Sequence, residues 1–248
     1  MSEFRGQGPA TLSSRELDTV DSGLAGGAIA RAAELESQLE AWPPGAGLTR
    51  SELLLELAGA YLDAGQSGQA FVPAEEAFFD FVEVARWESA VTAARAMYLA
   101  GDTQNESAEP FSTQNHEASI AALGHGIWLA VSMPVDPELT LAMLQHLIDE
   151  VPADADGAAV AAATAGFIVD LRCGDEAQEL HLFAGRMMAD VARRHSQVED
   201  QAGFDAWVSR LELDEPDKFL VRLRNVVDVL VQDRWTIDRD AIRAAMPE

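Results

Sequence analysis

Acidic side chains gather in the segment 149–157, "DEVPADADG", closely enough to suggest a metal site. Hard cations such as calcium and magnesium take oxygen ligands at short sequence spacing. The candidate metal ligands are therefore Asp149, Glu150, Asp154 and Asp156. An EF-hand loop would carry a Glu six residues after the Gly, where this chain has Ala163. Asp156 also stands where the N-cap of the following helix is expected.

A second set of carboxylates lies at helical spacing, four and three residues apart: Glu76, Asp80 and Glu83. Like charges so placed destabilise an isolated helix by a few tenths of a kcal/mol per pair, so a cation, an arginine or solvent must compensate them. A ferritin-like di-iron bundle would also need Glu-x-x-His, which does not occur in the sequence. We expect a solvated face relieved by Arg86.

Histidines and a tryptophan supply the candidate residues for a ligand pocket: His116, His125 and Trp128. The polar segment 102–115 precedes them and is longer than a compact domain usually needs, which favours a lid or a seam between lobes. Against this, nine residues separate the two histidines, which places them on opposite sides of a helix. Gly124 and Gly126 also weaken that helix.

Catalytic signatures are absent from the rest of the sequence. It contains no Gly-x-Ser-x-Gly and no glycine loop with a lysine for phosphate binding, and no cofactor is expected. His146, His181 and His195 lie on apolar stripes, which is typical of hydrogen-bonded core or boundary residues. Cys173 is the only cysteine, which excludes an intramolecular disulfide and a cysteine-based zinc site.

The net negative charge of the chain makes anionic binding partners unfavourable. The 42 acidic residues against 17 basic ones give a net charge of −25. Such a chain repels phosphate backbones and anionic lipids, so neither nucleic acid nor membrane is expected as partner. Lys218 is the only lysine, as in a halophilic protein or one from a high-G+C source. The lone cysteine and the lack of a signal-like or membrane-spanning segment predict a cytoplasmic protein.

Apolar residues recur at helical period along almost the whole chain, and no segment alternates as a strand would. We expect a single all-α domain over 1–248. The alternative is two lobes, 22–101 and 116–248, that the 102–115 loop joins. "GAAVAAATAG" consists of small residues, which predicts a helix in the middle of the bundle. The expected helices after the loop are 116–132, 136–150, 156–171, 175–195, 200–211, 215–232 and 238–245.

Residues 51–101 contain a two-helix pattern of bulky and small residues. The positions that carry it are Leu54, Leu57, Ala58, Tyr61, Gly65, Ala70, Ala74 and Ala77. This stretch resembles a tetratricopeptide repeat, which implies antiparallel helical hairpins stacked as a short α-solenoid or bundle. The sequence departs from the family's pattern in the next unit, where Tyr98 and Gly101 are three residues apart instead of four, and where a helix expected to open at Pro73 conflicts with the repeat register.

These features favour a non-enzymatic helical adaptor that binds another protein. Its expected contact surface is a concave groove lined by Tyr61, Phe78 or Tyr98, and the acidic middle third would attract a basic segment of the partner. The alternative is an enzyme or small-ligand-binding protein whose pocket lies between helices near the 102–115 loop. The sequence leaves the oligomeric state open.

Overall fold

The computed structural model describes residues 14–42, 47–101, 112–174 and 177–244. Over these ranges the chain forms eleven α-helices and no strand, which confirms the all-α prediction. The helices are α1 (Ser14–Glu40), α2 (Leu48–Asp63), α3 (Ser67–Glu83), α4 (Trp87–Gly101), α5 (Ser112–Ser132), α6 (Pro137–Glu150), α7 (Asp156–Cys173), α8 (Gln178–Ser196), α9 (Gln201–Arg210), α10 (Pro216–Val231) and α11 (Arg239–Ala244). No helix in the described ranges combines the length and apolar character needed to cross a membrane.

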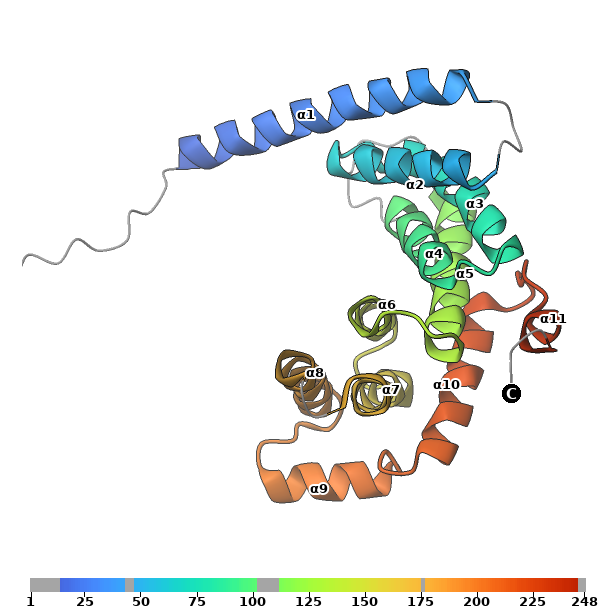
Figure 1. The fold of residues 1–248 in the computed structure, drawn as a ribbon. Coiled ribbons are helices and arrows are strands. Elements are labelled where there is room, and N and C mark those ends of the chain that lie inside the picture. The colour runs from blue at the N-terminus through green and yellow to red at the C-terminus, as the bar shows by residue number, and fades with distance from the viewer. Residues whose placement is uncertain (1–13, 43–46, 102–111, 175–176, 245–248) are drawn as a thin grey trace, which may run out of the picture.

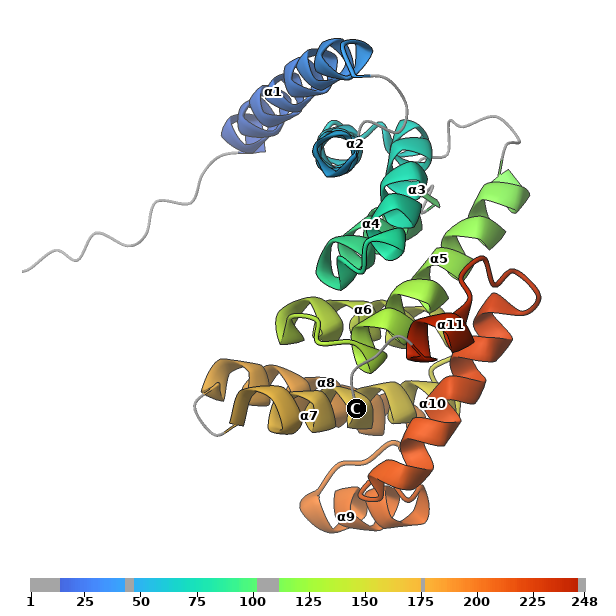
Figure 2. The ribbon, with the colours of Figure 1, turned by 45° about the vertical axis from the view of Figure 1, so that its right-hand side comes forward.

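The helices from α2 to α8 form two layers of a curved ladder (Figure 1). Each of them packs on the next along the chain, and α2 also contacts α4, α4 contacts α6, and α6 contacts α8. We call α2, α4, α6 and α8 the inner layer, because the curve opens toward their side, and α3, α5 and α7 the outer layer. Helix α10 runs across the outer layer and packs on α5 and α7 (Figure 2).

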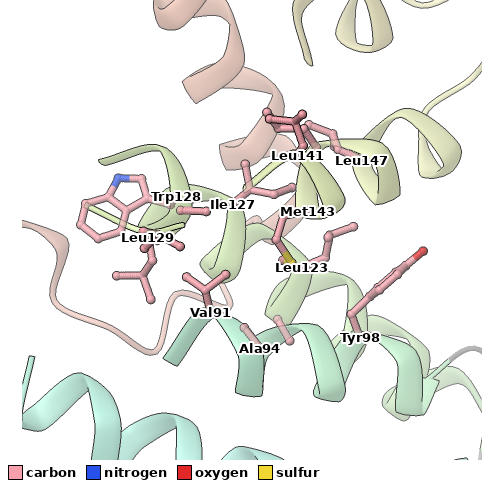
Figure 3. Packing of buried hydrophobic residues seen from close by; sticks show 14 of the residues in the cluster. Val91, Ala94, Tyr98, Leu123, Ile127, Trp128, Leu129, Leu141, Met143 and Leu147 are labelled. Atoms are coloured by element: carbon pink, nitrogen blue, oxygen red, sulfur yellow. The ribbon is translucent and has the colours of Figure 1, made fainter. Parts of the chain in front are cut away.

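The expected lobes meet directly in this arrangement. The segment proposed as their seam lies mostly outside the described residues, but α4 and α5 on either side of it pack against each other, and α4 also contacts α6. Figure 3 shows Val91 and Ala94 of α4 facing Leu123 of α5 and Met143 of α6. The two parts of the chain therefore share buried apolar surface.

The hairpin of α2 and α3 buries the positions that resemble a tetratricopeptide repeat. Leu54, Leu57, Ala58 and Tyr61 are buried on α2, and Ala70, Ala74 and Ala77 on α3. The expectation that a helix opens near Pro73 is wrong, because α3 begins at Ser67 and carries Pro73 in its interior. Extending the helix ahead of the proline lets it bury Ala70 completely, which offsets the backbone hydrogen bond that proline cannot donate.

Helix α5 is continuous through Gly124 and Gly126, contrary to the expectation that these residues weaken it. A Cβ atom at Gly124 would stand 2.2 Å from Val231 Cγ2, and one at Gly126 would stand 2.4 Å from Met143 Cε. The two glycines thus let α10 and α6 approach the backbone of α5 from different sides. Close packing repays their low helix propensity.

Helix α7 lies in the middle of the structure, as its small residues predict. It contacts α6, α8 and α10. Its buried residues form an almost unbroken run: Ala158, Ala159, Val160, Ala161, Ala162, Ala163, Thr164 and Ala165. Asp156 is the first residue of this helix rather than its N-cap, which is Ala155.

The C-terminal end of α5 is capped by Arg172, a residue of α7. The Arg172 Nη2 atom donates to the carbonyl oxygens of Ala130 (2.9 Å), Val131 (3.1 Å) and Met133 (2.9 Å). Its Nη1 atom donates to the carbonyl oxygen of Val135 (2.9 Å) and to Thr140 Oγ1 (3.1 Å). Burial lowers the pKa of Arg172 from its ordinary value, but the carbonyl oxygens at a helix C-terminus favour a cation.

Replacing Arg172 by Met should lower the free energy of unfolding by roughly 2–4 kcal/mol, because the buried acceptors lose their donor. Lysine at this position keeps the charge but offers fewer donors in a less rigid arrangement, so Arg172→Lys should restore only part of the loss. Urea unfolding followed by circular dichroism measures both changes. Arg86→Met, which removes an exposed pair to Glu52 at 3.7 Å, is the control. An equal effect of Arg86→Met and Arg172→Met would contradict the capping role.

Candidate functional site

Tyr61 and Tyr98, two tyrosines of the inner layer, are tied to carboxylates instead of facing an open groove. The Tyr61 hydroxyl donates to Glu36 of α1, and the Tyr98 hydroxyl donates to Glu150 Oε1 of α6 at 2.6 Å. Burial, followed by the hydrogen bond to Glu36, raises the pKa of Tyr61 to about 12. Both residues are only 8% exposed, so they join neighbouring helices.

Tyr98 belongs to a polar cluster between α4 and α6. Its ring lies 4.8 Å from the ring of His146, measured between centroids. Arg95 Nε donates to His146 Nε2 at 3.3 Å. Figure 3 shows the Tyr98 hydroxyl pointing away from the apolar cluster. His146 is thus a hydrogen-bonded boundary residue, as its apolar stripe predicts.

His125 lies in the core of the protein, where Phe78 stacks on it. The ring centroids of these two residues are 5.9 Å apart, with planes 19° from parallel. The ring of Trp235, which follows α10 in the chain, has its centroid 5.1 Å from that of His125. The backbone N–H of Thr236 donates to His125 Nε2 at 3.3 Å. Burial lowers the pKa of His125 to about 4, and the charge of Arg239 adds to this effect. The imidazole is therefore neutral near pH 7.

The candidate pocket residues of α5 do not converge. His116 is exposed, whereas His125 is only 3% exposed. Phe78 of α3, a residue of the expected binding groove, is likewise buried at 1% exposed. Trp128 lines a separate cavity of about 220 Å³ between α5 and α10, with Arg224 and Arg243 among the other lining residues. The expected site built from both histidines and the tryptophan is therefore not formed by the described residues.

The four candidate metal ligands turn toward different partners. Asp149 accepts from Gln145 and Glu150 from Tyr98, while Asp156 accepts from His195 Nε2 at 3.2 Å and from Arg222 at 3.3 Å. Asp154 is exposed. Across the described ranges, no three His, Cys, Asp or Glu residues lie close enough together to hold a metal ion. The cluster in the sequence separates in space because α6 ends at Glu150 and α7 starts at Asp156.

The acidic face of α3 is compensated by α2. Glu76 accepts a hydrogen bond from Arg50, and Asp80 accepts one from Ser51 Oγ at 2.6 Å. Arg86, which the sequence suggests as the compensating cation, pairs instead with Glu52 at 3.7 Å. The hairpin packing of α2 on α3 decides this choice, because it brings the first turn of α2 beside Glu76 and Asp80.

A groove of about 460 Å³ between α6 and α8 is lined by several arginine side chains, although the protein as a whole is acidic. We call it the α6–α8 groove; its lining residues are Gln145, Ile148, Asp149, Phe183, Arg186, Met187, Asp190, Arg193 and Arg194. The sequence signal for it is that residues 172–248 hold eleven of the seventeen basic side chains, together with the amphipathic period of α8. The groove itself could not be foreseen, because it needs the packing of α6 beside α8.

Comparisons with known proteins identify no family for this chain. The chain matches no protein-family model, and neither the curated proteins nor the solved structures give a significant match.

His125 should make the protein less stable as the pH falls. Its folded pKa of about 4 lies below the ordinary value of 6.5, so between these values the unfolded chain binds a proton that the folded protein does not. The free energy of unfolding is therefore unaffected by the titration of His125 above about pH 6.5, and it falls between pH 6.5 and pH 4 by up to about 3 kcal/mol. Urea unfolding at pH 7 and pH 5 measures the decline.

In the His125→Gln variant the decline between pH 7 and pH 5 should become shallower, whatever the absolute stability of that variant. His116→Gln, which removes an exposed histidine from the same helix, is the matched control. An unchanged pH slope in His125→Gln would show that His125 does not cause the dependence.

Proposed function

We propose that the protein is a non-enzymatic helical adaptor that binds another protein through its inner layer. The observation that carries this proposal is the unequal covering of the two layers. Helix α10 packs on α5 and α7 of the outer layer, whereas α2, α4, α6 and α8 line the open side of the curve (Figures 1 and 2). Curved helical ladders of this kind offer extended concave surfaces for binding.

Exposed groups on the inner layer support the proposal. Phe183 of α8 is 44% exposed and lines the α6–α8 groove. Large aromatic side chains and arginines are the residues that most often carry binding energy at protein interfaces. Tyr61, Phe78 and Tyr98 no longer serve as contact residues in this proposal, because packing buries them.

The net charge of −25 supports a protein partner over nucleic acid or an anionic membrane surface. A cytoplasmic location fits a chain with one cysteine, the half-buried Cys173. The resemblance of residues 51–101 to a tetratricopeptide repeat points in the same direction, since repeats of that family serve as protein-binding modules.

Site-specific photo-crosslinking tests the proposal. A photoreactive amino acid at Thr92, exposed on α4, or at Phe183 on α8 should crosslink one and the same partner in native extract. The control position is Val229, 74% exposed on α10. Crosslinking from Val229 alone, or no crosslinking from either inner-layer position, would overturn the proposal.

A second candidate function is small-ligand binding in the cavity between α5 and α10. The Trp128 ring and the side chains of Leu223 and Val227 give it apolar walls, and Arg224 and Arg243 contribute cations. Arg243 lies over the Trp128 ring, 5.3 Å from its centroid. Such a lining suits a small amphiphilic anion, whose apolar part would enter and whose charge would meet an arginine.

Titration with octanoate tests this second function through intrinsic tryptophan fluorescence. A saturable change that is absent in Trp128→Phe and weakened in Arg224→Gln would support it. No saturable change in the parent protein, or an equal change in Trp128→Phe, would exclude the cavity as the site for such an anion.

A further inference from the structure

We propose that the α6–α8 groove binds an acidic segment of the partner protein, with Arg186 and Arg194 as the residues that contact its carboxylates. This inference rests on the proposed function and specifies the chemistry of the partner. It differs from the sequence-based expectation of a basic partner segment, because this groove presents two arginines that pair with no carboxylate of the described chain.

The charges of the groove leave two arginines available. Neither of its two carboxylates pairs with Arg186 or Arg194, since Asp190 accepts from Arg193 Nη1 at 2.9 Å and Asp149 accepts from the neutral Gln145 Nε2 at 2.9 Å. Arg186 and Arg194 are exposed, and their side chains make no ion pair or hydrogen bond with any part of the chain that the structure describes. Both line the groove, so an incoming carboxylate meets two guanidinium groups that form no internal ion pair.

Among the arginine side chains that the structure describes, three form no ion pair or hydrogen bond: Arg186, Arg194 and Arg224. Arg224 lies apart from the groove, in the lining of the cavity between α5 and α10. Three other arginines of the C-terminal part are paired: Arg222 with Asp156, Arg234 with Glu117 and Arg239 with Asp228. Two unpaired cations in the lining of one groove mark a place on this acidic surface where an external anion is attracted instead of repelled.

Apolar groups in the groove favour a peptide over a free inorganic anion. Ile148 and Met187, 1% and 4% exposed, are among the lining residues, and Phe183 is 44% exposed beside them. A segment with acidic side chains and a leucine-like side chain would meet the arginines and the exposed Phe183 ring, whereas Ile148 and Met187 are already covered by the protein. A phosphate ion would use only the arginines, and a nucleic acid would bring its phosphates against the surrounding acidic surface.

Fluorescence anisotropy with a short fluorescein-labelled peptide of repeated Glu-Glu-Leu tests the inference on the full chain. The peptide should bind, and Arg186→Gln/Arg194→Gln should weaken its affinity about tenfold, since two charged contacts are lost. The control Arg86→Gln/Arg234→Gln makes the same change in net charge outside the groove, and should change the affinity by less than about twofold. Circular dichroism and the urea midpoint check that both double variants fold.

Two further probes decide between occupants. A Lys-Lys-Leu peptide should not bind the groove, and a single-stranded oligodeoxynucleotide should bind more weakly than the acidic peptide. Equal loss of affinity in the two double variants, or tighter binding of either of these probes, would overturn the inference. Competition by inorganic phosphate at equal strength would show a simple anion site and also overturn it.

The crosslinking experiment separates this inference from the proposed function. If Thr92 and Phe183 crosslink a partner while the acidic peptide does not depend on Arg186 and Arg194, the inference fails and the adaptor function stands. If no partner crosslinks from the inner layer, the adaptor function itself fails, whatever the peptide does.

Discussion

The contact of Arg172 with the end of α5 is the interaction on which the helical ladder most depends. One guanidinium from α7 meets four carbonyl oxygens and one hydroxyl at the turn between α5 and α6. All five acceptors are neutral oxygens, so the favourable energy comes from hydrogen bonds and the helix dipole and not from an ion pair. The contact fixes α7 against the junction of α5 and α6, and α5 in turn packs on α4, α6 and α10.

Close backbone approach around α5 explains why the two layers are covered differently. Gly124 admits Val231 of α10, and Gly126 admits Met143 of α6 and Ala94 of α4. His125 between them is enclosed by Phe78 and Trp235. These contacts bring α10 onto the outer layer, where it buries Phe219, Leu223, Val227 and Val231. On the other side, α1 packs on α2 and α9 packs on α8, and no described helix crosses the inner layer in the same way.

Ion pairs across the fold compensate part of the acidic charge. Asp156 of α7 meets Arg222 of α10 and His195 of α8, and Glu117 of α5 meets Arg234. Residues 172–248 carry eleven of the seventeen basic side chains, and these pairs show the C-terminal part compensating part of the acidic middle. Arg186 and Arg194 in the α6–α8 groove take no part in this pairing.

The sequence by itself determined the helices and the overall charge. Apolar period placed α10, and the Asp136-Pro137 pair marked the start of α6, where the Asp136 carboxylate accepts from the N–H groups of Glu138 and Leu139. These signals are local, since a helix face and an N-cap involve residues within a few positions of each other. Only the tertiary structure decided that Arg50 and not Arg86 meets Glu76, that the four acids of 149–156 separate, and that Arg186 and Arg194 stay unpaired. Such outcomes depend on contacts between residues tens of positions apart, 42 for Arg172 and Ala130, which no local period encodes.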